Sequence, residues 1–258
     1  MRKVLVTGAA GRIGSAFHAY AADRYDLRLA DRRREGLDAP PVGEVIHLEI
    51  ADLDACLTAC QGIDTVLHLA ADPSPRSEFY ASFLDNNIKG VYNIFEAARQ
   101  AGCRRVVFAS SVQVIGGYPL DVQACTDGAV RPLNMYGACK AFGEATAHCY
   151  AYGHGLSSIA VRIGSFEHNR AVFTPSARNL STFVSARDLC QLFVRCIEVE
   201  NVQFAIVHGV SDNRFKRMDL STTRETVGYR PQDDAFVKFG VGLVETKRWL
   251  QEHPREEI

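Results

Sequence analysis

The sequence predicts an α/β fold: a doubly wound parallel sheet covered by helices on both faces. Two observations support this. Short apolar runs alternate with helical patterns through residues 1–165, and a glycine-rich turn directly follows the first apolar run. Alternation of this kind is typical of βαβ units, whose strands run parallel. Its order is that of a Rossmann fold.

The expected elements alternate along the chain. We expect strands at Lys3–Thr7, Asp26–Ala30, Glu44–Leu48, Asp64–Leu69, Arg105–Ala109, Ser158–Ile163 and Phe204–His208. We expect helices over Ile13–Ala21, Asp52–Cys60, Phe83–Gln100, Met135–Tyr152, Val184–Val199 and Val241–Leu250. Residues 165–182 are polar and without periodicity, and 214–228 read as irregular or short helical. We therefore expect a single domain over 1–258, with 1–164 as the Rossmann core and 165–258 as mostly a small C-terminal substrate-binding region.

Composition excludes several classes of function. Lys and Arg total 29 against 30 Asp and Glu, so the net charge is −1 and gives no case for nucleic acid or an anionic membrane. No apolar run approaches a membrane-spanning length, and the chain enters a strand at once, so we expect no signal peptide and a cytoplasmic protein. The 8 cysteines form no Cys-x-x-Cys pair, so we expect reduced thiols and no metal site.

The glycine-rich turn predicts a dinucleotide site. Gly8 permits a tight turn, Gly11 allows backbone to approach a phosphate, and Gly14 lets the next helix pack closely on the strand. The helix that follows points its N-terminus at the bound anion. Arg12 and Ile13 lie within the same turn and are included in the predicted cofactor site.

The residue at the end of the second strand predicts which dinucleotide binds. Asp31 follows the run 26–30, where a carboxylate accepts the ribose hydroxyls of NAD and repels a 2′-phosphate. Arg32, Arg33 and Arg34 come next, and any of them could pair with a 2′-phosphate. We expect NAD, with use of NADP left open.

A tyrosine and a lysine predict proton transfer. Tyr136 and Lys140 lie one helical turn apart and share a helix face. Lowering a tyrosine pKa from near 10 to neutral pH takes about 4 kcal/mol, which a nearby ammonium and a positive nicotinamide ring can supply. Ser111 ends the strand before this helix, at the carboxyl edge where ligands bind. We expect Ser111, rather than Ser110, to hold the reacting oxygen.

These motifs together resemble those of the extended short-chain dehydrogenases/reductases. The stretch 108–116 (FASSVQVIG) resembles the family's catalytic-serine strand, with Ser111 at the catalytic position. The stretch 85–93 (DNNIKGVYN) resembles its active-site helix, which implies that Asn87 orders the site and contacts the cofactor region. Further cofactor contacts implied by the resemblance are Asp52 and Leu53 at the adenine, and Leu69, Ala70 and Ala71 in the loop over the cofactor.

A narrower resemblance is to uronate dehydrogenases. It covers 161–165 (VRIGS) and 178–185 (RNLSTFVS), and it implies that Ser165 and Arg178 hold a sugar acid. An arginine also suits a carboxylate on chemical grounds, because it can bind both oxygens at once. Those enzymes usually have Asn-His after the catalytic serine. This chain has Val112 and Gln113, so its contacts to the sugar ring are altered.

The loop 72–75 (DPSP) is longer than in uronate dehydrogenases and adds Ser74 as a candidate substrate contact. His168 and Asn169, in the polar segment, are further candidates.

The resemblance implies NAD-dependent oxidation of a hexuronate-type sugar acid at its anomeric carbon, giving a lactone. One alternative is a sugar or nucleotide-sugar epimerase or reductase of the same superfamily, although about 90 residues after the sixth strand leave little to enclose a nucleoside diphosphate. A non-catalytic NAD-binding regulator is the other alternative, and Ser111, Tyr136 and Lys140 argue against it.

The resemblance also implies a homodimer through the helices at 83–100 and 135–152. The second of these carries small and apolar residues at helical spacing: Ala138, Ala141, Phe142, Ala145 and Cys149.

Overall fold

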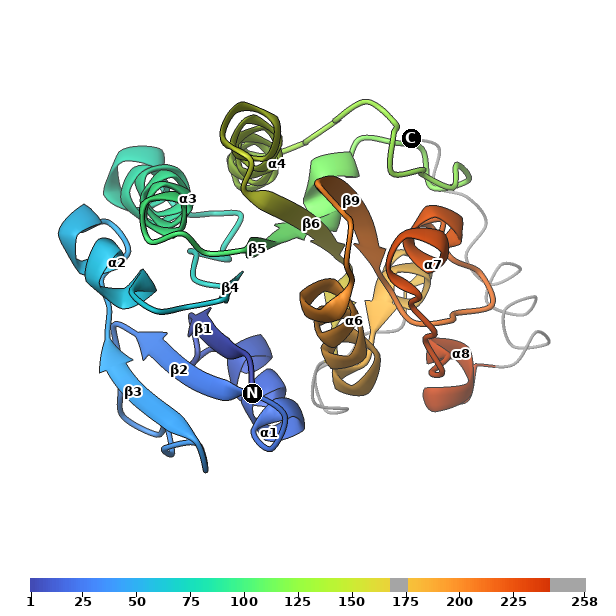
Figure 1. Cartoon of the computed structure of the whole chain (residues 1–258). Helices are drawn as coiled ribbons and strands as arrows, with labels where there is room; N and C mark the ends of the chain where they lie inside the picture. Colours follow the sequence, from blue (N-terminus) through green and yellow to red (C-terminus); the bar gives the residue numbers. More distant parts are fainter. Residues whose placement is uncertain (168–175, 242–258) are drawn as a thin grey trace.

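The computed structural model describes residues 1–167 and 176–241, and its centre is one parallel sheet (Figure 1). Its strand order is β3-β2-β1-β4-β5-β6-β9. The strands are β1 (Lys3–Thr7), β2 (Asp26–Asp31), β3 (Gly43–His47), β4 (Thr65–His68), β5 (Arg105–Ser111), β6 (Ser157–Ile163) and β9 (Phe204–Gly209). All neighbours in this sheet pair in parallel, so the predicted fold class is confirmed.

Helices cover both faces of the sheet (Figure 1). One layer holds α1 (Arg12–Ala21) and α6 (Ala186–Glu198), and the other holds α2 (Leu53–Cys60), α3 (Gly90–Gln100) and α4 (Met135–His154). The remaining elements are η1 (Phe79–Lys89), η2 (Val112–Ile115), β7 (Ser165–Phe166), α5 (Ala177–Thr182), β8 (Phe183–Val184), α7 (Ser221–Val227) and α8 (Ala235–Lys238).

The sheet separates two apolar cores because side chains alternate along each strand. Along β1, Val4 and Val6 face the α1/α6 layer, whereas Leu5 faces the α2/α3/α4 layer. In the first layer the rings of Phe17 and Phe193 meet edge to face, with centroids 6.0 Å apart. All five side chains are fully buried. The continuous apolar runs seen in the sequence are therefore strands covered on both faces.

Helix geometry in one segment departs from the sequence prediction. The helix expected at 83–100 begins earlier, at Phe79, and its first part, η1, is π-helical. Its opening shows the wider spacing, since the amide of Phe83 donates to the carbonyl of Glu78. A π-helix forms i→i+5 hydrogen bonds, and the sequence prediction of a helix does not distinguish this geometry from an α-helix. Such π segments are frequent at functional sites.

The segment after residue 164 contributes a strand to the main sheet and a helix to the α1/α6 layer. β9 is an edge strand of the main sheet, and α6 packs on α1. The helix expected over 241–250 lies outside the described residues except for Val241, and so do His168 and Asn169. Within 1–167 and 176–241, no helix has both the length and the apolar character needed to cross a membrane.

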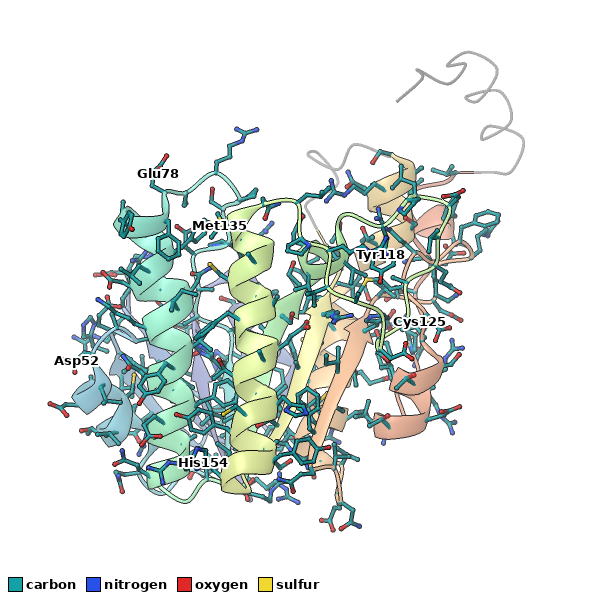
Figure 2. The ribbon with its side chains drawn as sticks, turned by 90° about the horizontal axis from the view of Figure 1, so that it is seen from above. Asp52, Glu78, Tyr118, Cys125, Met135 and His154 are labelled. Atoms are coloured by element: carbon teal, nitrogen blue, oxygen red, sulfur yellow. The ribbon has the colours of Figure 1, made fainter. Side chains whose placement is uncertain are left out.

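The strand order places ligand-binding residues at one edge. The two halves of the sheet diverge between β1 and β4, and in such sheets ligands bind at the carboxyl ends of the strands beside this switch point. Figure 2 shows η1 and α4 side by side, with Glu78 and Met135 at the same end of the two helices.

Candidate active site

A cavity of about 600 Å³ lies along the carboxyl edge of the sheet. It joins residues at the carboxyl ends of six strands, β1 to β6, and at the start of α4. Of the predicted site residues it includes Gly8, Gly11, Arg12, Ile13, Gly14, Asp31, Leu69, Ala70, Ala71, Ser111, Val112, Gln113, Tyr136, Lys140 and Ser165. The predicted cofactor loop and the predicted proton-transfer group therefore share one cavity.

The glycine loop fits a dinucleotide pyrophosphate. A Cβ added at Gly14 would lie 2.4 Å from the carbonyl oxygen of Gly8, so only glycine lets α1 pack this closely. A Cβ added at Gly11 would meet only that same oxygen, at 3.1 Å. The space beside Gly11 is thus left open by the protein, on the cavity side of the helix N-terminus. A phosphate can approach the backbone there.

Asp31 ends β2 and is held by two backbone amides. Its carboxylate accepts from the amide of Ala10 at 3.0 Å and from the amide of Arg33 at 3.0 Å. These contacts fix the carboxylate at the rim of the cavity, where ribose hydroxyls can donate to it. The side chains of Arg32 and Arg33 line the same cavity.

The predicted adenine contacts, Asp52 and Leu53, lie at the start of α2. Neither residue lines the cavity; Leu48, Glu49 and Ile50 do. The side chain of Asp52 instead caps α2 and accepts from the amide of Ala55 at 3.1 Å. The three residues directly after β3 pass along the sheet edge, whereas Asp52 is already committed to starting a helix.

Tyr136 is positioned by the way α4 begins. Asn134 caps the helix and accepts from the amide of Gly137 at 2.9 Å. A Cβ added at Gly137 would lie 2.5 Å from the carbonyl oxygen of Gln113, so this glycine lets η2 and α4 approach closely. The close approach brings Tyr136 to Ser111, which directly precedes η2.

Tyr136 and Ser111 both line the cavity. Burial raises the pKa of Tyr136 to about 12, an interaction with the Ser111 hydroxyl lowers it, and the charge of Asp72 raises it. In the protein alone Tyr136 therefore carries its proton. A positive charge near the hydroxyl is needed before Tyr136 can take a proton from a substrate.

Lys140 supplies such a charge from within the protein. It is only 3% exposed, and burial lowers its pKa to about 8. Its ammonium nitrogen lies 5.1 Å from the centre of the Phe108 ring and 5.6 Å from the centre of the Tyr136 ring. Cation–π attraction of this kind partly replaces lost hydration. Lys140 is thus a desolvated cation beside the tyrosine.

Asn87 orders the site from behind. It is 1% exposed, and its amide oxygen accepts from the amide of Asp72 at 2.8 Å while its amide nitrogen donates to the carbonyl of Asp72 at 3.0 Å. Asn87 therefore fixes the loop after β4. Its neighbour Asn86, rather than Asn87, lines the cavity.

Asp72 is a site residue that the sequence prediction did not include. Its carboxylate lies in the cavity and accepts from the hydroxyl of Ser82 and from the amide of Ser74. Ser74 was expected to face the substrate, but Pro73 and Pro75 line the cavity in its place. The Asp72 carboxylate turns the loop so that these prolines face inward.

A buried network separates the roles of the two neighbouring serines. The hydroxyl of Ser110 donates to Glu144 at 2.6 Å, and Glu144 also receives both arms of Arg162, each at 2.8 Å. The ion pair is 1% and 5% exposed on its two side chains. Ser110 is therefore part of a structural network, which leaves Ser111 to meet Tyr136.

The predicted substrate side of the cavity is lined by residues of η2 and β7. Ser165 lines the cavity and shares a hydrogen bond of 2.9 Å with Thr182. Gln113 also lines it, and its amide oxygen accepts from Asn134 at 3.3 Å and from Arg178 at 3.4 Å. The described cavity wall does not include Arg178 itself, which reaches the site through Gln113.

Comparison with known proteins identifies the class. The model of the NAD dependent epimerase/dehydratase family matches residues 4–187. The chain therefore belongs to the NAD-dependent epimerase/dehydratase family.

Within the family, the chain is similar to sugar dehydrogenases. The NAD-dependent glucose-6-phosphate dehydrogenase of Haloferax volcanii is 35% identical over 90% of this chain and 94% of its own length. The uronate dehydrogenase of Pseudomonas putida is 34% identical over 90% of this chain and 85% of its own. A variant of Agrobacterium tumefaciens uronate dehydrogenase solved with NAD covers 100% of this chain and 92% of its own, with 30% identity and a TM-score of 0.82. These similarities confirm the predicted enzyme class, an NAD-dependent dehydrogenase, and the predicted cofactor, NAD.

Proposed function

We propose that this enzyme oxidises an anionic aldose at its anomeric carbon to a lactone, with NAD as the hydride acceptor and a hexuronate or an aldose phosphate as the candidate substrate. One observation carries the proposal. Ser111 and Tyr136 lie beside a desolvated Lys140, in the cavity that begins at the glycine loop. This is a proton-transfer group at the point where a sugar hydroxyl would meet a nicotinamide.

Each of the three residues has a distinct role in the proposed step. Ser111 donates to the anomeric oxygen and holds it, while Tyr136 takes the hydroxyl proton. Lys140 stabilises the tyrosinate electrostatically, since a neighbouring cation favours the charged form. Bound NAD supplies a hydride acceptor and a positively charged ring. The C1–H bond breaks as a hydride and the O–H bond breaks as a proton, so a carbonyl forms at C1.

The remaining polar residues position the sugar. Ser165 and Gln113 line the substrate side of the cavity. Two donors occupy the amide oxygen of Gln113, so its amide nitrogen is the part left to donate to a ring hydroxyl. Arg178 adds a positive charge behind Gln113. The two relatives named above act on a sugar acid and a sugar phosphate, and both kinds of substrate carry a negative charge that suits this arginine.

A substrate panel tests the proposal. Glucuronate, galacturonate, glucose 6-phosphate, glucose, a hydroxy acid and a UDP-sugar are each incubated with NAD. Reduced cofactor is followed by absorbance, and the UDP-sugar is also assayed for binding and epimerisation. We expect turnover of at least one anionic aldose, no turnover of the hydroxy acid, and a lactone as the first product. If no aldose is oxidised while a nucleotide sugar is bound or epimerised, the proposal is wrong.

We also propose that the enzyme is a homodimer in the cytoplasm, assembled through α3 and α4. These helices lie side by side (Figure 2). Both carry exposed aromatic residues. Tyr92 on α3 is 48% exposed, and Phe142 and Tyr152 on α4 are 38% and 64% exposed. Light scattering at micromolar concentration should give twice the mass of one chain, and Phe142→Glu should shift it towards the monomer. A monomeric mass for the wild type would contradict the dimer.

A further inference from the structure

Arg217 is a buried guanidinium without a counter-charge among the described residues. It is 5% exposed and forms no ion pair with any carboxylate in 1–167 or 176–241. One of its amino groups donates to the carbonyls of Gly116 and Tyr118, at 3.3 Å and 2.5 Å. Its Nε is buried with no hydrogen-bond partner in the described structure. A buried cation in this state is costly unless something pairs with it.

Arg217 and Arg178 are held next to each other by the backbone. The amide of Arg217 donates to the carbonyl of Ser181 at 3.1 Å, one helical turn after Arg178 on α5. Both guanidinium groups reach the same element, η2, because Arg178 contacts Gln113 within it and Arg217 contacts Gly116 at its end. Burial lowers the pKa of Arg217, and the charge of Arg178 lowers it further. Two positive charges therefore lie behind the substrate side of the cavity.

We propose that Arg178 and Arg217 together form a subsite for a phosphate monoester, so that the preferred substrate is a phosphorylated aldose. This inference rests on the proposed function and names its substrate class. A carboxylate carries one negative charge and would leave one of the two guanidiniums uncompensated. A phosphate monoester carries about −1.5 to −2 at neutral pH and offers three acceptor oxygens, which suits two guanidiniums.

The position of the two arginines fits a longer substrate. The cavity wall includes Gln113 but not Arg178 or Arg217. An anion must therefore extend past Gln113 to reach them. A phosphate ester on the far end of the sugar extends farther from the ring than a carboxylate at the same carbon. In the proposed complex, the phosphate takes the donors of Arg217 that pair with no described residue, its Nε and its second amino group.

The test compares three substrates in the wild type and in matched variants. We expect kcat/KM for glucose 6-phosphate to be at least 10-fold higher than kcat/KM for glucuronate. The difference from kcat/KM for glucose should be larger still. Arg217→Gln should lower kcat/KM for glucose 6-phosphate about 10- to 150-fold, because the phosphate loses one charged hydrogen-bonding partner. It should change kcat/KM for glucuronate less than about 3-fold. Arg214→Gln is the matched control: this nearby arginine is exposed and pairs with Asp234, so no substrate should be affected.

A second readout does not depend on turnover. Glucose 6-phosphate should raise the melting temperature of the wild type in the presence of NADH, which permits binding without oxidation, and should raise it much less for Arg217→Gln. If the glutamine variant does not fold, Arg217→Lys replaces it in both measurements, because lysine keeps the charge and one donor direction. If glucuronate is oxidised at least as well as glucose 6-phosphate, the phosphate subsite is refuted while the proposed function stands. If no aldose is oxidised, the proposed function fails, and stabilisation by glucose 6-phosphate alone decides the subsite.

Discussion

Replacing the buried Lys140 with methionine should make the protein more stable and inactive. The pKa of Lys140 is lowered from 10.5 to about 8 by burial. Each unit corresponds to 1.36 kcal/mol, so the charged form destabilises the folded protein by about 3 kcal/mol at pH 7. Methionine has a similar length and carries no charge. Lys140→Met should therefore raise the free energy of unfolding of the cofactor-free protein by about 3 kcal/mol, or the melting temperature by about 6–12 °C.

The pH dependence identifies the cause of this effect. Between pH 8 and 10.5 the unfolded chain holds the Lys140 proton while the folded chain has released it, so the stability of the wild type rises with pH in this range. The stability advantage of Lys140→Met is thus full below pH 8 and shrinks towards pH 10.5. Urea unfolding at pH 7 and pH 10 measures it. Lys89→Met is the control, because Lys89 is exposed and pairs with Asp85, and it should change stability by less than about 1 kcal/mol.

If Lys140→Met is less stable than the wild type, burial of the charge is not the dominant effect. The same holds if its gain in unfolding free energy over the wild type is equal at pH 7 and pH 10. The stabilised variant should also lose turnover, since no cation remains to favour the tyrosinate. Stability and activity would then be opposed at one residue, as is common where a site needs a desolvated charge.

Three further predictions concern the cofactor and the proton. Gly11→Ala should fold with near wild-type stability, because the added Cβ meets only one oxygen, at 3.1 Å. It should nevertheless bind NAD at least about 10-fold more weakly, as measured by calorimetry. Gly14→Ala should lose stability as well, because its added Cβ would lie 2.4 Å from a backbone atom. Asp31→Ala should weaken the binding of NAD and reduce the preference for NAD over NADP. A wild-type enzyme that uses NADP better than NAD would contradict this role of Asp31. Tyr136→Phe should abolish turnover with NAD affinity nearly unchanged, and a retained rate of a tenth or more would show that Tyr136 is not the base.

Residues whose role depends on one strand end could be predicted from the sequence. Asp31 and Ser111 end strands, and Gly11 and Tyr136 lie at the start of helices. The carboxyl ends of parallel strands must meet at one edge. The alternation of apolar runs and helical patterns fixes that edge without knowledge of side-chain contacts. The cavity contains all four of these residues.

Residues whose role depends on contacts between distant segments could not be predicted. Asp52 matched a motif, but its side chain was needed as a helix cap, and the neighbouring residues 48–50 line the cavity. Asp72 carries no sequence signal, because its effect on Tyr136 comes from the turn that Asn87 and Ser82 impose. Arg217 likewise acquires its surroundings only when η2 packs against α5.

Deuterium at the anomeric carbon shows directly whether the hydride leaves from C1. Glucuronate and glucose 6-phosphate deuterated at C1 are each oxidised by the wild type with NAD, and the reduced cofactor is analysed by mass spectrometry. The account predicts a reduced cofactor heavier by one mass unit, together with a lactone product. Reduced cofactor without deuterium would show that the hydride leaves another carbon, and would contradict oxidation at C1.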